Sequence, residues 1–219
     1  MSPVLETTEL YRFYRAGEEE TLALRGVSLH VRIGEFVAVS GPSGSGKSTL
    51  LACLAGLDEP DGGTVRIDGT RISHRPERER AALRARLVGV VFQSGNLIEH
   101  LTVRQNIDLA QRLAGRRDRG WREESLADLR LAHRAGARPS ELSGGEAARS
   151  AVAVAVAAHP AVVLADEPTG ELDAYTERGV LDLLRDLTEQ GTAVIVASHS
   201  PAVAQVADST VTLRDGRIV

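Results

Sequence analysis

Cysteine, aromatic residues and positive net charge are all scarce in this chain of 219 residues. A single cysteine, Cys53, excludes an internal disulfide and fits a reducing compartment, and we expect it to be a small buried apolar residue. The formal net charge of −4 and the aromatic content of 3% argue against a dedicated nucleic-acid-binding protein. No apolar run approaches the length of a membrane-spanning helix, and the N-terminus has no signal-peptide pattern. The composition predicts one cytosolic domain.

Lysine is almost absent, since only one of the 26 basic residues, Lys47, is not an arginine. It lies in a segment that reads as an apolar strand, a glycine-rich turn and a helix, FVAVSGPSGSGKSTLLACLAG. Residues 41–48 fit the phosphate-binding pattern G-x-x-x-x-G-K-S in that context. The backbone N–H groups would surround phosphate oxygens, Lys47 would reach the β- and γ-phosphates, and Ser48 would contact Mg²⁺. The segment predicts a nucleoside triphosphate site rather than a flexible loop.

A second strand, AVVLA at residues 161–165, ends in two carboxylates, Asp166 and Glu167. Its continuous apolar run is typical of a strand buried on both faces of a parallel sheet. Asp166 would then lie beside the phosphate loop and help to hold Mg²⁺, and Glu167 could deprotonate an attacking water. A solvated turn is the alternative, and the phosphate loop upstream favours the catalytic interpretation.

A third apolar strand, TAVIVAS at residues 192–198, is followed by His199 and a helix-starting Ser-Pro. The alternative for His199 is a residue that only caps the next turn. Ligands of open α/β sheets bind at the carboxyl ends of the strands. The P-loop, the Asp166–Glu167 pair and His199 each follow the carboxyl end of a predicted strand. We therefore expect His199 to contact the γ-phosphate and the attacking water.

A further helix start, LSGGEAARS at residues 142–150, has the spacing of a capping box between Ser143 and Glu146. Two glycines, Gly144 and Gly145, follow at the start of this helix. Within a helix, each glycine lowers stability by about 0.5–1 kcal/mol relative to alanine. The segment therefore indicates that something approaches its bare backbone closely.

In this order the motifs resemble those of the ATP-binding subunit of ATP-binding-cassette (ABC) transporters, over nearly the whole chain. They are the P-loop GPSGSGKST, the Q-loop VVFQSGNLIEHLTVRQNI, the signature LSGGE, Walker B VVLADEP, the D-loop GELD and the switch ASHS. The sequences FQSGNLIEHLTV and LADEPTGELD resemble those of one branch of this family, the lipoprotein-releasing and macrolide-export systems, which have FtsX-like permeases.

The resemblance implies two subunits facing head to tail, with each ATP between one P-loop and the partner's signature. The glycines of the signature would thus meet the partner's γ-phosphate. Implied catalytic residues are Glu167, His199 and Gln93, and implied Mg²⁺ ligands are Ser48, Gln93 and Asp166. Asp173 would link the two active sites across the dimer. The implied ATP-contacting residues are Tyr14, which would stack on adenine, Gly41, Ser43, Gly44, Ser45, Gly46, Lys47, Ser48 and Thr49, together with Ser143, Gly144, Gly145 and Glu146 of the signature. Tyr11 competes with Tyr14, and either could instead face the sheet.

The implied fold is α/β: a P-loop NTPase core with a mostly parallel sheet (residues 1–93 and 161–219), an antiparallel β region, and an inserted helical subdomain at about residues 94–160. The Arg-rich part of the insert, residues 116–139, reads as a solvated amphipathic helix rather than an RNA-binding patch. The segment GNLIEHL after Gln93 would dock a separate permease, placing the subunit on the inner face of the membrane. Alternatives are an ABC ATPase acting on translation or DNA, which should show a second cassette or a long coiled coil, and a cassette that binds ATP only for signalling.

Three features depart from the family pattern: Glu146 stands where glutamine is usual, Val154 stands where the branch has a second arginine, and the helical insert is short. The Glu146 carboxylate caps its own helix but would repel the partner's phosphate. The sequence therefore predicts that Glu146→Gln tightens ATP-driven dimerisation.

Overall fold

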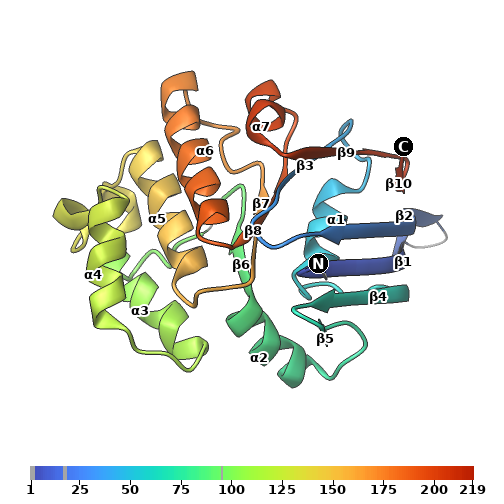
Figure 1. Cartoon of the computed structure of the whole chain (residues 1–219), viewed down its shortest axis with the longest axis horizontal. Helices are drawn as coiled ribbons and strands as arrows, with labels where there is room; N and C mark the ends of the chain where they lie inside the picture. The colour runs from blue at the N-terminus through green and yellow to red at the C-terminus, as the bar shows by residue number, and fades with distance from the viewer. Residues whose placement is uncertain (1–2, 17–18, 95) are drawn as a thin grey trace.

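The computed structural model describes residues 3–16, 19–94 and 96–219. Figure 1 shows several helices on one side of the molecule and the antiparallel sheet on the other, with strands of a second sheet between them. The antiparallel sheet has the order β2-β1-β4-β5 and the central sheet the order β10-β9-β3-β8-β7-β6. The strands are β1 Leu5–Ala16, β2 Glu19–Val31, β3 Phe36–Ser40, β4 Gly62–Ile67, β5 Thr70–Arg71, β6 Val88–Val91, β7 Val162–Asp166, β8 Ala193–Ala197, β9 Ser209–Arg214 and β10 Arg217–Ile218.

The central sheet is parallel from β9 to β6, and its last strand, β10, pairs antiparallel with β9. Strands β3, β7 and β8 are buried almost throughout, as their continuous apolar sequences predict. Their successive side chains enter opposite cores: Val37 and Val39 pack with α1 and the antiparallel sheet, and Phe36 and Ala38 pack with α5, α6 and α7. The expected P-loop NTPase core with an antiparallel β region is confirmed.

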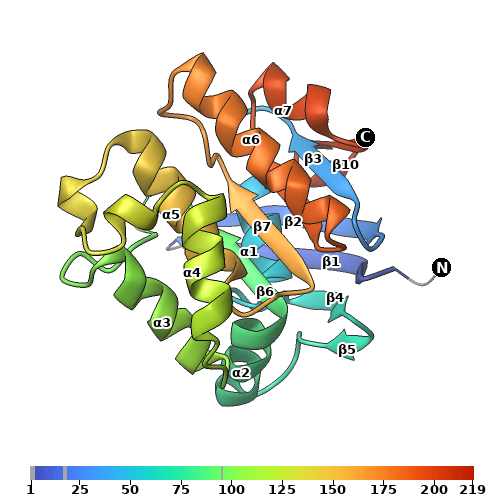
Figure 2. The same cartoon turned by 60° about the vertical axis from the view of Figure 1, so that its left-hand side comes forward.

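Along the chain, the helices alternate with single strands or groups of strands, and α3, α4 and α5 follow one another between β6 and β7. Figure 2 shows α3, α4 and α5 side by side at one end of the molecule. Their bounds are α1 Lys47–Leu54, α2 Glu77–Leu87, α3 Val103–Leu113, α4 Arg119–Asp128, α5 Gly144–Val156, α6 Ala174–Glu189 and α7 Pro201–Val206, with 3₁₀ turns η1 Ala132–Arg134 and η2 Pro139–Glu141. Helices α3, α4 and α5 share a small core that includes Val103, Ile107, Leu126 and Ala153.

The Arg-rich segment is not one helix, which corrects the expectation for residues 116–139. Helix α4 ends at Asp128, and Arg130 follows with φ of 56° in the left-handed region. The segment continues as the turns η1 and η2, the second of which starts at Pro139. A left-handed residue stops an α-helix, and proline limits the residue before it to extended conformations, so the helix cannot continue through this stretch.

Cys53 is buried as expected, with 1% of its surface exposed. Burial raises the pKa of its thiol to about 12. The thiol therefore stays protonated and behaves as an apolar group of the core.

Candidate functional site

Four neighbouring strands of the central sheet deliver the predicted polar residues to one edge. The P-loop follows β3, His199 follows β8, Asp166 ends β7 with Glu167 directly after it, and Gln93 follows β6. Because these strands are parallel, their carboxyl ends lie together. A cavity of about 930 Å³ opens there, and its lining includes Tyr14, Gly41, Ser43, Gly44, Gly46, Lys47, Ser48, Thr49, Gln93, Asp166, Glu167 and His199. The structure thus brings together the residues that the sequence assigned to one nucleotide site, except Ser45, whose buried hydroxyl has no hydrogen-bond partner among the described residues.

The P-loop begins α1 without a side-chain cap. Its N-cap residue, Gly46, has φ of 103° in the left-handed region, and a Cβ there would lie 2.5 Å from the carbonyl oxygen of Ala23. Only glycine fits this position. The N–H groups of Gly44, Gly46 and Lys47 have no acceptor within the described chain, which leaves them to bind an anion. The Lys47 ammonium donates to the carbonyl oxygens of Gly41 and Pro42 at 2.8 and 3.1 Å, which holds it over the loop.

Glu167 is held from two sides by the residues that end β8. Its Oε1 lies 2.8 Å from Nδ1 of His199, and its Oε2 accepts a hydrogen bond of 2.8 Å from the Ser198 hydroxyl. The backbone of Glu167 has φ of 46°, a strained value for a residue other than glycine. The predicted base and the predicted switch histidine are therefore in direct contact.

Ser198 is a site residue that the sequence reasoning missed. Its hydroxyl accepts from the N–H of Ser200 at 3.1 Å, which directs its proton to Glu167. It is 5% exposed, and its N–H donates to the carbonyl oxygen of Val39 in β3. The available signal was a hydroxyl residue directly before His199 at a strand end.

The residues predicted to hold Mg²⁺ supply oxygen donors of the kind this ion prefers. Ser48, Gln93 and Asp166 offer a hydroxyl, an amide carbonyl and a carboxylate to the same cavity. Among the described residues, no group of three or more His, Cys, Asp and Glu side chains could hold a metal ion. This donor set fits an ion that is also bound by substrate phosphates and water.

Tyr14 lines the cavity, whereas Tyr11 does not. The Tyr14 hydroxyl donates to Asp58 at 2.6 Å, and the Arg12 guanidinium lies 4.7 Å from the ring centroid. Burial, followed by the bond to Asp58, raises the pKa of Tyr14. Tyr11 packs over Gly26 and Gly62 of the antiparallel sheet. Of the two tyrosines, the geometry favours Tyr14 as the one that contacts the base of a nucleotide.

The signature segment lies outside this cavity and forms the expected capping box. Ser143 Oγ accepts from the Glu146 N–H at 3.3 Å, and Glu146 Oε2 accepts from the Ser143 N–H at 2.9 Å. The N–H groups of Gly144 and Gly145 have no acceptor within the described chain. These two donors point to a ligand that the chain itself does not supply.

Gly145 has a second reason to be glycine that the sequence did not reveal. A Cβ at this position would lie 2.7 Å from Cγ2 of Thr176 at the start of α6, and at Gly144 it would lie 3.4 Å from Cδ2 of Leu172. The bare backbone of Gly145 thus lets α5 pack against α6 within one chain. Only Gly144 is without a close internal contact of this kind.

Asp173 is the N-cap of α6. Its carboxylate accepts from the N–H groups of Tyr175 and Thr176 and from the Thr176 hydroxyl, at 3.0, 3.0 and 2.6 Å. These bonds, the Thr176 hydroxyl first, lower the pKa of Asp173. An aspartate before a helix is a known capping signal, so this role could have been predicted from the sequence.

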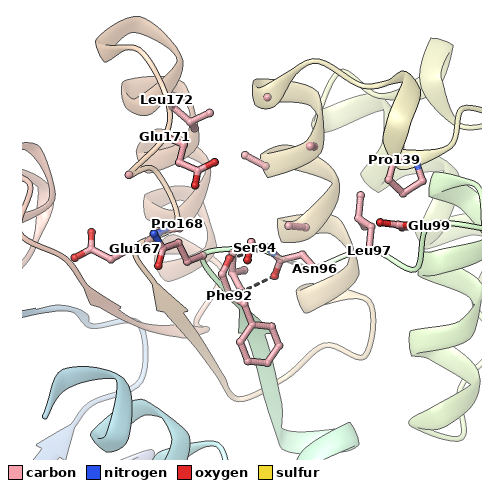
Figure 3. Close-up of a pocket in the computed structure, with 17 residues that line it drawn as sticks. Phe92, Ser94, Asn96, Leu97, Glu99, Pro139, Glu167, Pro168, Glu171 and Leu172 are labelled. Atoms are coloured by element: carbon pink, nitrogen blue, oxygen red, sulfur yellow. Dashed lines mark hydrogen bonds between the residues drawn. The ribbon is translucent and has the colours of Figure 1, made fainter. Parts of the chain in front are cut away.

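A second cavity, of about 340 Å³, lies between the segment after β6, the start of α5 and the segment after β7. Figure 3 shows the Glu167 carboxylate turned away from the segment that carries Leu97 and Glu99. The Asn96 side chain bonds both the N–H and the carbonyl oxygen of Phe92, each at 2.6 Å, and so fixes this segment.

Of the GNLIEHL segment that the sequence assigned to permease docking, Gly95 lies outside the described residues. Phe92 and Ile98 are exposed, at 44% and 40%.

Residues 24–170 match the protein family described as ABC transporter. The chain is 43% identical to an uncharacterised ABC transporter ATP-binding protein of Thermotoga maritima, covering 100% of this chain and 94% of the relative. It is 42% identical to the lipoprotein-releasing system ATP-binding protein LolD of Zymomonas mobilis, covering 99% and 95%. It is 40% identical to the macrolide export ATP-binding/permease protein MacB of Chlorobium luteolum, of which it spans only 33%.

Solved structures agree with this match. The dimeric structure of a bacterial ABC transporter cassette superposes with a TM-score of 0.88 at 36% identity, covering 98% of this chain and 96% of the other. A dimeric post-hydrolysis state of such a cassette, bound to ADP and phosphate, superposes with a TM-score of 0.89 at the same identity and coverage. The motif order, the shared edge of the sheet and these matches agree, and the chain belongs to the ABC transporter family as one of its ATP-binding cassettes.

Proposed function

We propose that the chain binds ATP in the 930 Å³ cavity and hydrolyses it, with Glu167 as general base and His199 as the group that positions both the base and the γ-phosphate. The observation that carries this proposal is the contact of 2.8 Å between the two side chains at the ends of β7 and β8. A general base must be oriented by a second group to act on a bound water. Ser198 restrains the other carboxylate oxygen, so that Glu167 keeps one orientation.

Each remaining residue of the cavity has a role that its chemistry supports. The N–H groups of Gly44 and Gly46 and the Lys47 ammonium bind phosphate oxygens, and Tyr14 stacks on the adenine. Ser48, Gln93 and Asp166 would hold Mg²⁺, which supplies positive charge to the phosphates when bound. Gln93 lies two residues after the end of β6 and next to Phe92, so a change at this site would reach the segment that carries Phe92 and Ile98.

The signature supports a head-to-tail dimer of two copies. Ser143 and Gly144 are exposed, and the N–H groups of Gly144 and Gly145 have no acceptor in the described chain. They do not line the 930 Å³ cavity of their own chain, so they would complete the corresponding site of a second copy. Asp173, at the start of α6 close to Gly145, would link the two sites across the interface. The dimeric cassettes among the similar structures support this arrangement.

A separate membrane permease is the proposed partner, and the FtsX-like type is the one we favour. No helix among the described residues has the length and apolar character to cross a membrane. The relatives include a lipoprotein-releasing ATP-binding protein and a protein that combines ATP-binding and permease parts. Phe92 and Ile98, which are exposed and lie one and five positions from Gln93 along the chain, would contact a permease helix that holds the chain at the inner face of the membrane.

Substitution of the base tests this function. Glu167→Gln should retain ATP binding and lower steady-state hydrolysis by about 10²–10⁴-fold, the usual contribution of a general base. The matched control is Glu124→Gln, which removes an exposed carboxylate of α4 that does not line the cavity and should leave ATP hydrolysis at the wild-type rate. Turnover of Glu167→Gln within a few-fold of wild type would refute the assignment. A wild-type chain that binds ATP without hydrolysing it would favour the signalling cassette instead.

A further inference from the structure

The glutamate of the signature is not an isolated charge. Glu146 Oε1 accepts a hydrogen bond of 2.8 Å from Nε of Arg134, and Nε2 of His133 lies 3.5 Å from the same oxygen. Its other oxygen is engaged by the Ser143 N–H in the capping box. The Glu146 side chain is 12% exposed, so the start of α5 and the turn η1 enclose it.

This pair changes the electrostatics of the signature. A lone carboxylate in the first turn of α5 would oppose an anion at the N–H groups of Gly144 and Gly145, which have no acceptor in the described chain. Arg134 brings a guanidinium into contact with that carboxylate, so the two charges cancel locally. The bond to Arg134, followed by that from Ser143, lowers the pKa of Glu146 to about 2, so the pair is ionised on both sides at neutral pH.

We propose that Arg134 is a positioning residue of the signature: it neutralises Glu146 and fixes the capping box, so that the N–H groups of Gly144 and Gly145 can receive the γ-phosphate of a second copy's ATP. This inference rests on the proposed head-to-tail dimer. It replaces the repulsion expected from the sequence, because the sequence placed Glu146 at the signature without its counter-charge. Arg134 lies twelve residues upstream on a different element.

The test is a double-mutant cycle in the full chain, on a Glu167→Gln background that preserves the ATP-bound dimer. Dimer affinity is measured by sedimentation in saturating ATP and Mg²⁺. Arg134→Ala should weaken dimerisation by about tenfold, since it leaves an uncompensated carboxylate beside the phosphate. Adding Glu146→Gln to Arg134→Ala should restore affinity to within about threefold of the parent, because the unpaired charge is then gone. Glu146→Gln alone should change affinity by less than about threefold.

Three further measurements separate this role from a general effect on folding. Arg134→Lys keeps the charge and should dimerise within about threefold of the parent. Arg117→Ala, which removes an exposed arginine of the loop between α3 and α4, should leave affinity unchanged. In about 0.5 M NaCl the defect of Arg134→Ala should shrink, because salt screens the repulsion. The thermal midpoint without nucleotide reports any loss of folding.

Each outcome is decisive. A double variant as weak as Arg134→Ala would overturn the proposal, because Arg134 would then act without Glu146. Equal affinity of Arg134→Ala and the parent would overturn it as well. If the parent itself does not dimerise in ATP, the proposed dimer fails and this inference fails with it, whereas a dimer that ignores the charge pair refutes this inference alone.

Discussion

Two helices of this chain begin at segments proposed to bind phosphate, and they begin in opposite ways. Helix α1 has a left-handed glycine as its N-cap, no side-chain cap and no acidic residue in its first turn. Helix α5 has a complete capping box between Ser143 and Glu146, with the acidic residue paired to Arg134. The start of α1 lines the 930 Å³ cavity, whereas the start of α5 does not.

The difference shows how each helix start is stabilised. At α1 several backbone donors have no acceptor in the described chain, so this start depends most on a bound anion. At α5 the protein's own side chains satisfy part of the helix end, and the two glycine N–H groups are left over. A surface that a second copy covers only part of the time has to be stable alone, and the capping box provides that stability.

Removing the cation at α1 should have the largest effect. Lys47→Ala should weaken binding of a labelled ATP analogue by about 100-fold or more, because Lys47 is the charged donor of the loop. Arg25→Ala is the control, since Arg25 lines the same cavity but lies outside the P-loop. This variant should weaken binding of the ATP analogue by no more than about fivefold. Wild-type affinity of Lys47→Ala would mean that α1 does not hold the phosphates.

At α5, two glycine substitutions should separate packing from phosphate binding. Gly145→Ala should lower the free energy of unfolding by about 1–3 kcal/mol, because its new methyl group would overlap Cγ2 of Thr176. Gly144→Ala should leave that free energy nearly unchanged and still weaken ATP-driven dimerisation, since a methyl group there would crowd an incoming phosphate. Urea unfolding and sedimentation give the two quantities.

The rescue variant for Gly145→Ala is Thr176→Ser, which deletes Cγ2 and keeps the hydroxyl that bonds Asp173. The double variant should recover most of the lost stability. Equal destabilisation by both glycine variants would show that packing against α6 does not distinguish the two positions.

The smallest expected effect is the pH dependence of the α5 cap. The pKa of Glu146 is lowered from its ordinary 4.5 to about 2, so the folded state binds its proton less readily than the unfolded state. The stability that Glu146 provides should be complete above pH 4.5 and should be lost as the pH falls towards about 2. The difference in thermal midpoint between the wild type and Glu146→Gln should therefore shrink in that window. A difference that is constant down to pH 3 would contradict the assignment of the shift to the pair with Arg134.

Much of the nucleotide site could be predicted because its parts are local. The strands before Asp166 and His199 lie within one residue of their predicted bounds, as β7 and β8. The capping box of Ser143 and the proline-started helix after His199 are present as expected. Each of these features depends on residues a few positions apart, so hydrophobic periodicity and capping rules were enough to find it.

The sequence by itself determined the family motifs, their order and the edge of the sheet where they meet, because parallel strands place their carboxyl ends together. Only the tertiary structure decided the pairing of Arg134 with Glu146, the hold of Ser198 on Glu167 and the packing of Gly145 against Thr176. Each of these contacts joins residues from different parts of the fold, 12 to 31 positions apart along the chain. The sequence did not show that Glu146 has Arg134 beside it, since whether a carboxylate is a lone charge or half of an ion pair depends on what the fold places next to it.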